Sequence, residues 1–196
     1  MQYSEDMETK LYNTTRSFFR KRIFRFNHDF HLARIDAIIT DLSKTGGICD
    51  MEGVVIKELS QFHDQRGWLV EIYREDETDF SPAMSYVSLT KPGIARGPHE
   101  HMDQSDYFCF LGHFRLYLWD NRKDSKTYQK NLVFDTLGKP FTAIVPPKVV
   151  HAYKNIGKED GIVINLPDRL FKGKGKSLAI DEVRYENDPG SPFRMD

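Results

Sequence analysis

The chain has 196 residues, enough for one domain with a full core and an extension but short for two complete domains. Its 28 Lys and Arg nearly balance its 29 Asp and Glu, so the net charge of -1 gives no sign of a nucleic-acid binder and favours a small, locally recognised ligand. Cys49 and Cys109 are too few for a disulfide framework and indicate a reducing compartment. Because the sequence shows neither a membrane-span length of apolar residues nor a secretory leader, it predicts a cytoplasmic protein.

Residues 1–50 differ in pattern from the rest. The stretch "TRSFFRKRIFRFNHDFHLARIDAIITDL" places basic residues among Phe, Ile and Leu at spacings of three and four, which predicts an amphipathic helix, and "SKTGG" ends it. Such a helix can bind a membrane surface or a partner. Since "MEGVVIKELSQF" resembles a natural protein start at Met51, the stronger alternatives are a loosely attached extension, helical or disordered, or a gene start assigned too early. We therefore expect an extension over residues 1–50 and one folded domain over residues 51–196.

The second part of the chain consists of short segments rich in Val, Ile, Tyr, Phe and Leu, separated by turn residues such as "DQRG", "KPG" and "DNRKDS". Many short strands with regular turns predict an all-β fold, an antiparallel sandwich or barrel. The final run, "FKGKGKSLAIDEVRYENDPGSPF", is polar and rich in Gly and Lys, so we expect a tail that folds over the barrel rather than a further pair of strands. The expected strands are "GVVIKEL", "WLVEIYR", "AMSYVSLT", "DYFCFL", "FRLYLWD", "NLVFDTL", "FTAIVP", "VHAYKNI" and "GIVINLP".

Three histidines stand out in this pattern. His99 and His101 in "GPHEHMDQSDYFCFLG" project to the same face if the segment is extended, because side chains two apart in a strand share a side. His151 follows in "VPPKVVHAYKN" at the start of a later strand. Neutral imidazoles suit zinc, iron, copper or nickel, but histidine is also the usual general base near neutral pH, and an inward histidine is commonly just hydrogen-bonded.

The two histidine blocks resemble the motifs of the cupin superfamily, which are small jelly-roll barrels. Pro146, His151 and Asn155 match the second motif, with Lys148 in place of its glycine. In the first motif, Ser105 stands where metal-binding cupins carry a glutamate, and strand alternation places the neighbouring Asp106 on the other face. The resemblance therefore implies a cupin-type jelly-roll barrel with no required metal, and a metal site of His99, His101 and His151 as the alternative.

Five further stretches resemble the dTDP-4-dehydrorhamnose 3,5-epimerase family in order and spacing. They are "HDQRGWLVEIYR", "ARGPHEH", "LYLWDNRKDSKTYQ", "VPPKVVHAY" and "VRYENDP", and together they extend over about residues 53–190. A single stretch is a weak signal, but five in register are specific for the family. The resemblance implies an isomerase of rhamnose and polysaccharide biosynthesis that moves protons next to the ketone of a nucleotide-linked 4-keto-6-deoxy sugar.

The resemblance also implies roles for individual residues. Arg66 matches the arginine that binds the nucleotide diphosphate, and Arg96 matches the one beside the sugar and its phosphates, as guanidinium groups suit such oxyanions. Glu71 matches a glutamate near the nucleotide, His99 the catalytic base, and His151 a histidine of the same pocket. Asp188 is the nearest match to the aspartate that pairs with the base, although "RYENDP" is one residue longer than the family run, so that Asn187 is the alternative.

Two positions depart from the family. The lysine that helps to stabilise the enolate corresponds to Ser105, and the tyrosine that donates a proton on the opposite sugar face corresponds to Ile164, thirteen positions after His151. Since epimerisation needs an acid and a base on opposite faces, we expect a substitute donor or only part of the reaction. The candidate substitutes are Tyr107, Tyr117 and Tyr153.

His101 points to a second kind of enzyme. The paired histidines of "RGPHEH" resemble the sugar 3,4-ketoisomerases, jelly-roll enzymes whose two histidines shuttle protons, and place His101 among the substrate-binding residues. The first prediction is nevertheless the epimerase, with His99 as its base and no cofactor. A metal-dependent cupin with three histidine ligands and a binding module that has lost its chemistry are the remaining hypotheses. Members of the family form dimers that exchange a strand, so the resemblance also implies a homodimer.

Overall fold

The computed structural model of the protein describes residues 50–195. The expected helical extension therefore lies outside the described residues, except for Asp50. Twelve strands and two short 3-10 turns make up the described part of the chain. The strands are β1 Val55–Glu58, β2 Gln61–Asp64, β3 Gly67–Val70, β4 Tyr86–Thr90, β5 Ala95–Glu100, β6 Asp106–Leu111, β7 Phe114–Asp120, β8 Asn131–Asp135, β9 Phe141–Val145, β10 Val149–Asn155, β11 Gly161–Asn165 and β12 Val183–Arg184.

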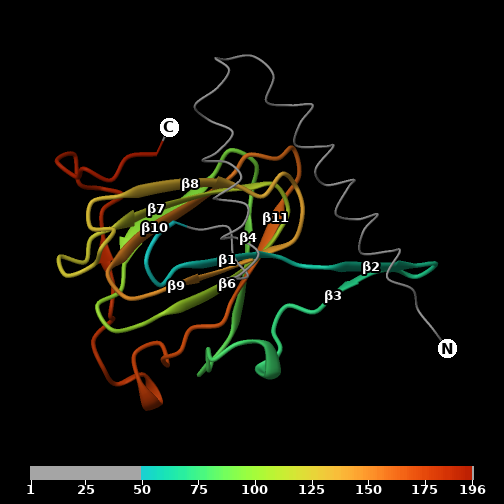
Figure 1. Ribbon diagram of the computed structural model, residues 1–196, viewed down its shortest axis with the longest axis horizontal. Coiled ribbons are helices and arrows are strands. Elements are labelled where there is room, and N and C mark those ends of the chain that lie inside the picture. The colour runs from blue at the N-terminus through green and yellow to red at the C-terminus, as the bar shows by residue number, and fades with distance from the viewer. Residues whose placement is uncertain (1–49, 196) are drawn as a thin grey trace, which may run out of the picture. The chain divides into compact units, whose positions relative to one another are not determined.

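Ten of these strands form two facing antiparallel sheets (Figure 1). We call the sheet with the order β1-β9-β6-β11-β4 sheet A and the sheet with the order β12-β5-β10-β7-β8 sheet C. Neighbouring strands in each sheet are far apart in the sequence, as in a jelly roll. The prediction of an all-β, cupin-type jelly-roll barrel is confirmed. Over residues 50–195, every helical segment is too short to cross a membrane.

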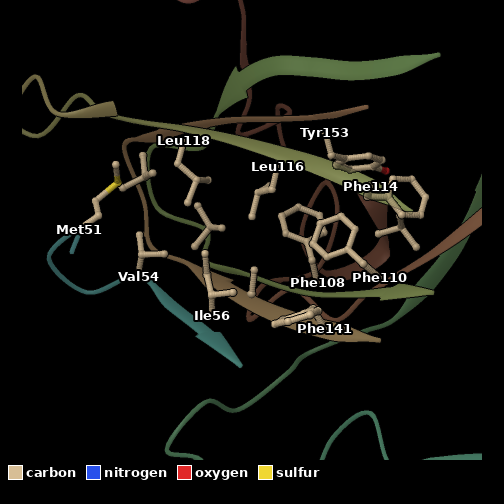
Figure 2. Close-up of a cluster of buried hydrophobic side chains, with 14 residues drawn as sticks. Met51, Val54, Ile56, Phe108, Phe110, Phe114, Leu116, Leu118, Phe141 and Tyr153 are labelled. Atoms are coloured by element: carbon tan, nitrogen blue, oxygen red, sulfur yellow. The ribbon is translucent and has the colours of Figure 1, made fainter. Parts of the chain in front are cut away.

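The core lies between the two sheets (Figure 2). Aromatic side chains fill one half of it, and Phe110 and Phe114 are 1% and 0% exposed. Aliphatic side chains such as Ile56 and Leu118 fill the other half, next to Met51. Fully burying a side chain of this size stabilises the fold by roughly 1.5 to 3 kcal/mol. The alternation of apolar residues that predicted these strands thus arises from a core between two sheets.

Strand β6 is buried on both of its faces, which explains the unbroken apolar run "DYFCFL". Phe108 and Phe110 point into the core, whereas Tyr107 lies on the outer face, where it packs against Tyr73 and Phe80. The Tyr107 hydroxyl donates to the carbonyl of Ile72 at 2.9 Å. The segment that carries Tyr73 and Phe80 therefore covers the outer face of sheet A beside β6.

The expected strand segments all contain strands of the structure, but three strands were not among them. β2 and β5 were not predicted as strands in their own right, and the tail contributes the two-residue strand β12, which pairs Val183 with Glu100 and Arg184 with His99. The tail does fold against the barrel, as expected. It also extends sheet C beside the histidines.

Two backbone positions with positive φ fix the loops around the histidines. Gly97 has φ of +81°, and a Cβ there would lie 2.5 Å from the carbonyl oxygen of His151, so only glycine lets β5 and β10 approach this closely. Lys148 has φ of +61°, in the turn where the cupin motif has glycine. Its backbone N–H donates to the carbonyl of His101 at 2.8 Å. A main-chain hydrogen bond therefore links the two cupin motifs.

The hairpin β2–β3 pairs with neither main sheet and extends away from both of them (Figure 1). Its apolar side chains are exposed: Phe62 is 56%, Trp68 55% and Leu69 60% exposed. Burying large apolar residues is favourable, so a projecting hairpin of this composition is typical of an interaction surface.

Candidate active site

Three imidazoles meet at one end of the barrel interior. His99 and His151 are direct neighbours across the β5–β10 ladder, with ring centroids 4.4 Å apart. His101 follows β5 directly, and its ring centroid lies 5.5 Å from that of His99 and 5.7 Å from that of His151. The expectation that the two sequence blocks bring these side chains together agrees with this geometry. We refer to His99, His101 and His151 as the histidine cluster.

Asp106, the first residue of β6, faces the histidine cluster, so the prediction that it points away was wrong. Its Oδ2 lies 3.2 Å from Nε2 of His101 and 3.5 Å from Nε2 of His151. Asp106 shares a face with the core residues Phe108 and Phe110, because side chains two apart point the same way. Ser105 lies before the strand begins, and its backbone N–H donates to Asp168. Asp106, not Ser105, is therefore the polar residue that β6 delivers to the site.

Amides and a phenol surround Asp106 on sheet A. Asn165 of β11 donates from Nδ2 to Oδ1 of Asp106 at 2.8 Å, and Gln104 donates from Nε2 to the same oxygen at 3.0 Å. The Asn165 amide also donates to the hydroxyl of Tyr86 at 2.9 Å. Tyr86 on β4 is the direct cross-strand partner of Asn165, so both side chains project into the barrel. We call Tyr86, Asp106 and Asn165 the sheet A wall.

The tail completes the opposite side of the site. Glu182, just before β12, places Oε1 3.8 Å from Nε2 of His99. Asp181 accepts hydrogen bonds from the backbone N–H groups of Met102, Asp103 and Gln104 at 2.7 to 3.0 Å. The carbonyl of Asp181 also contacts Nδ1 of His101. The tail therefore holds both the loop after β5 and two members of the histidine cluster.

His101 is the positive charge of the site. Burial disfavours its charged form, but the hydrogen bond and charge of Asp106 outweigh burial and raise the pKa of His101 to about 9. Both ring nitrogens have an acceptor, since Nδ1 faces the Asp181 carbonyl and Nε2 faces Asp106. The pKa of the Asp106 carboxyl is lowered, since His101, His151 and Asn165 together outweigh its burial. The two groups form a buried ion pair.

His99 is neutral. Its burial, followed by unfavourable electrostatic interactions with the His151 and His101 rings, lowers the pKa of His99 to about 2. Burial likewise lowers the pKa of His151, whose Nδ1 contacts the Val149 carbonyl at 3.1 Å. The unprotonated ring nitrogen of His99 is therefore available to accept a proton, beside the carboxylate of Glu182.

The histidine cluster has some of the features of a metal site. Its ligand atoms lie within 4.8 Å of one another, and Nε2 of His151 is buried without a hydrogen-bond partner, which is compatible with a metal ligand. A metal needs a lone pair from each imidazole, however, and both nitrogens of His101 face acceptors. The arrangement of these side chains fits a cationic His101 better than a centre of three histidine ligands.

The residues predicted to bind the nucleotide and its phosphates lie apart from one another in the single chain. Arg96 of β5 donates to Thr90 Oγ1 at 3.2 Å and to the Leu89 carbonyl at 3.1 Å, across the seam between the sheets. Arg66 lies at the turn of the β2–β3 hairpin, where its exposed guanidinium pairs with Asp64. Glu71 lines a cavity of about 350 Å³ on the outer face of sheet A and pairs with Arg74. Within one chain, only Arg96 is on a strand that carries the histidine cluster.

Other predicted positions also lie away from the histidine cluster. Asp188 is exposed in a turn, where its carboxylate accepts from the N–H of Gly190, and Glu182 takes the place beside His99. Ile164 pairs with Cys109 on the outer face of sheet A, so it does not face the cluster. Of the three candidate tyrosines, Tyr153 alone packs in the core, where its hydroxyl lies 3.3 Å from Ser88 Oγ.

The sequence reasoning missed Tyr86, Asn165, Gln104, Asp181 and Glu182. Tyr86 and Asn165 could have been found by strand alternation, because each begins or ends a short strand with the core-facing parity of its neighbours. Glu182 and Asp181 belong to a polar tail without periodicity, so pattern reasoning had no signal for them. Their place depends on tertiary pairing between β12 and β5.

Comparisons with known proteins identify the family of the chain. The family model of dTDP-4-dehydrorhamnose 3,5-epimerase matches residues 49–181. The probable low-salt glycan biosynthesis epimerase Agl13 of Haloferax volcanii is 36% identical over 128 residues, 62% of this chain and 81% of that protein. The spore coat polysaccharide biosynthesis protein SpsL of Bacillus subtilis is 32% identical over 112 residues, 55% of this chain and 74% of that protein.

A solved structure shares the fold. The dTDP sugar isomerase of Desulfovibrio desulfuricans matches with a TM-score of 0.60 and 22% identity, over 71% of this chain and 87% of that chain. The family model extends over most of the described residues, and Agl13 is matched over most of its length. The chain therefore belongs to the dTDP-4-dehydrorhamnose 3,5-epimerase family, which comprises isomerases that act on nucleotide-linked sugars.

Proposed function

We propose that the protein epimerises a nucleotide-linked 4-keto-6-deoxyhexose at a carbon next to the ketone, with His99 as the base. The observation that carries the proposal is the pairing of a neutral His99 with Glu182 at 3.8 Å, beside the cationic His101. A neutral imidazole accepts a proton, and a neighbouring carboxylate stabilises the imidazolium that forms. The pKa of His99 is low without substrate, and a negative charge placed beside the ring would raise it.

In the first step, His99 takes the proton from the carbon, and the electron pair of the C–H bond forms the double bond of an enolate. Negative charge then develops on the former ketone oxygen. Fixed positive charge in a dry site stabilises such an oxyanion. His101, with both nitrogens held by Asp106 and Asp181, supplies a positive charge that is already oriented. This supports an electrostatic role for His101 in place of the family lysine.

The test is solvent deuterium incorporation into dTDP-4-keto-6-deoxyglucose, followed by mass spectrometry and NMR. The parent protein should incorporate deuterium at one or both carbons that flank the ketone. His99→Asn should reduce this exchange at least about 100-fold, since positioned general bases contribute about 10²- to 10⁴-fold. The control is His113→Asn, which alters a histidine paired with Asp135 outside the histidine cluster. If the parent protein incorporates no deuterium at either carbon, the proposal is contradicted, and a binding module without catalysis is the remaining hypothesis.

Two competing functions predict different outcomes. A 3,4-ketoisomerase would move the ketone, which NMR of the product detects, but the two contacts that hold the His101 ring do not favour a proton shuttle. A metal-dependent cupin would retain stoichiometric iron, zinc or nickel when purified without chelators. The buried Nε2 of His151, which makes no hydrogen bond although Asp106 Oδ2 lies 3.5 Å away, is the observation that favours this second candidate.

A homodimer would give a role to Arg66 and to the exposed β2–β3 hairpin that carries it. The β2–β3 hairpin carries Arg66 at its turn together with exposed Phe62, Trp68 and Leu69, and it makes no pairing with the sheets of its own chain. The outer face of β4 is also apolar and exposed. We propose that a second copy receives the hairpin, so that Arg66 approaches the diphosphate of its partner's substrate. Cys109, a buried free thiol, supports a reducing compartment such as the cytoplasm.

A further inference from the structure

Epimerisation needs a second proton-transfer group, and the sheet A wall holds a phenol that no sequence motif assigns. Tyr86 lies on the edge strand of sheet A, and its side chain shares a face with Asn165. Its hydroxyl accepts a hydrogen bond from Asn165 at 2.9 Å, and the same amide donates to Asp106 at 2.8 Å. The residue is 48% exposed, although this hydroxyl bonds inside the barrel. Tyr86 is therefore half exposed to solvent, while its hydroxyl faces the interior of the barrel.

The base and the phenol come from different sheets. His99 and Glu182 belong to the side formed by β5 and β12 of sheet C, whereas Tyr86 belongs to sheet A. Glu182 acts on both: it lies 3.8 Å from Nε2 of His99, and its charge contributes to the raised pKa of Tyr86. Glu182 is thus a common electrostatic neighbour of two groups that come from opposite sheets. A sugar ring bound between the sheets beside Glu182 would present one face to each group.

We propose that Tyr86 is the proton donor on the face of the sugar opposite to His99. This inference rests on the proposed epimerase function and names the group that replaces the tyrosine expected at Ile164. Tyr86 gives its hydroxyl proton to the enolate carbon, whose double-bond electron pair forms the new C–H bond while the ketone is restored. The tyrosinate left behind regains a proton from water, and the His99 imidazolium releases one to water, so the protons balance.

The surroundings of Tyr86 suit this role. Burial is the main reason that its pKa is raised to about 12, and the hydroxyl therefore stays protonated until a ligand develops charge beside it. The nearby Asn165 amide donates to the phenol oxygen and would stabilise the tyrosinate. Tyr153, the other inward-facing tyrosine, is 4% exposed among Phe108, Phe110 and Phe114, which leaves no room for a sugar beside its ring.

The experiment separates abstraction of a proton from inversion of the carbon. In D₂O, Tyr86→Phe should still incorporate deuterium from His99 with retained configuration, at a rate within about threefold of that of the parent protein. The inverted sugar should form at least about 100-fold more slowly than with the parent protein. Tyr128→Phe, a change in the exposed β7–β8 loop, is the matched control with parental inversion. The Asn165–Asp106 hydrogen bond does not involve the phenol, so the variant should keep its fold, which circular dichroism checks.

Different outcomes overturn different statements. Inversion at the parental rate by Tyr86→Phe, or loss of inversion in Tyr153→Phe instead, would overturn the role of Tyr86 while leaving His99 as the base. Loss of exchange together with inversion in a folded Tyr86→Phe would also overturn it, because the phenol would then act before the enolate forms. A parent protein that neither exchanges nor inverts would overturn the proposed function, and the role of Tyr86 with it.

Discussion

His101 links the chemistry of the site to the stability of the fold. Its pKa is raised to about 9 in the folded protein, against an ordinary value of about 6.5. Its protonation therefore contributes stability that is complete below pH 6.5 and is lost as the pH rises through 9. We expect the free energy of unfolding, from urea titrations, to fall by on the order of 3 kcal/mol between pH 6.5 and 9.

NMR titration of the histidines tests the ion pair of His101 and Asp106 independently. The NMR signals of His101 should titrate near pH 9, whereas those of His99, whose pKa is lowered by burial, should show the neutral ring throughout the neutral range. The acid side has the opposite sign: His99 and Asp106 both bind fewer protons when folded, so stability also falls as the pH drops below 6.5. A stability curve that is flat from pH 6.5 to 9 would contradict the ion pair of His101 and Asp106.

At the residue scale, sequence reasoning found the side chains that short motifs carry and missed those that only the fold brings near. The grouping of His99, His101 and His151 was predictable because strand pairing preserves the parity of neighbours. Asp106 was placed on the wrong face because the alternation was counted from Ser105, which lies before the strand; counted from the core residue Phe108, it places Asp106 inward. Glu182 had no signal, as its position beside His99 depends on a pairing of only two residues.

At the element scale, β12 determines which acidic side chain lies beside His99. Because β12 pairs with β5 in register, the residue just before it, Glu182, reaches His99, while Asp188 lies beyond the strand in an exposed turn. We expect Glu182→Gln to lower kcat at least about tenfold with little change in KM, since it removes the charge that stabilises the imidazolium. Asp188→Asn should have a much smaller effect. Steady-state kinetics of both variants decide between the two carboxylates. A larger loss of kcat in Asp188→Asn than in Glu182→Gln would show that Asp188, not Glu182, supports His99.

Strand prediction succeeded where a strand buries one or two apolar faces. It failed where a segment becomes a strand only through pairing with neighbouring strands. β6, β7 and β10 contain continuous or alternating apolar residues. β5 has the sequence "ARGPHE", whose glycine and proline weaken any strand signal, although Gly97 is needed for close contact with His151. The strand that carries His99 was thus hard to predict, because its close packing against β10 needs residues that the strand pattern disfavours.

At the scale of the whole molecule, the exposed apolar surfaces predict assembly. Val87 and Leu89 on the outer face of β4 are 68% and 51% exposed, in addition to the apolar side chains of the β2–β3 hairpin. Self-association would remove both surfaces from water. We expect sedimentation equilibrium to give a dimer. The paired change Trp68→Lys and Leu69→Lys should shift the protein to a monomer that remains folded, because the hairpin lies outside the core. A monomeric parent protein would contradict this assembly.

The dimer makes a stronger prediction about where Arg66 acts. If Arg66 serves the partner's site, a dimer of one Arg66→Ala subunit and one His99→Asn subunit holds one site with both residues intact. Random mixing of two variants that are each nearly inactive should then restore about a quarter of parental activity, as half of the dimers are mixed and each has one complete site. Co-refolded subunits, assayed by deuterium exchange, measure this. If Arg66 serves its own chain instead, no mixed dimer contains a complete site, and activity stays at the level of the separate variants.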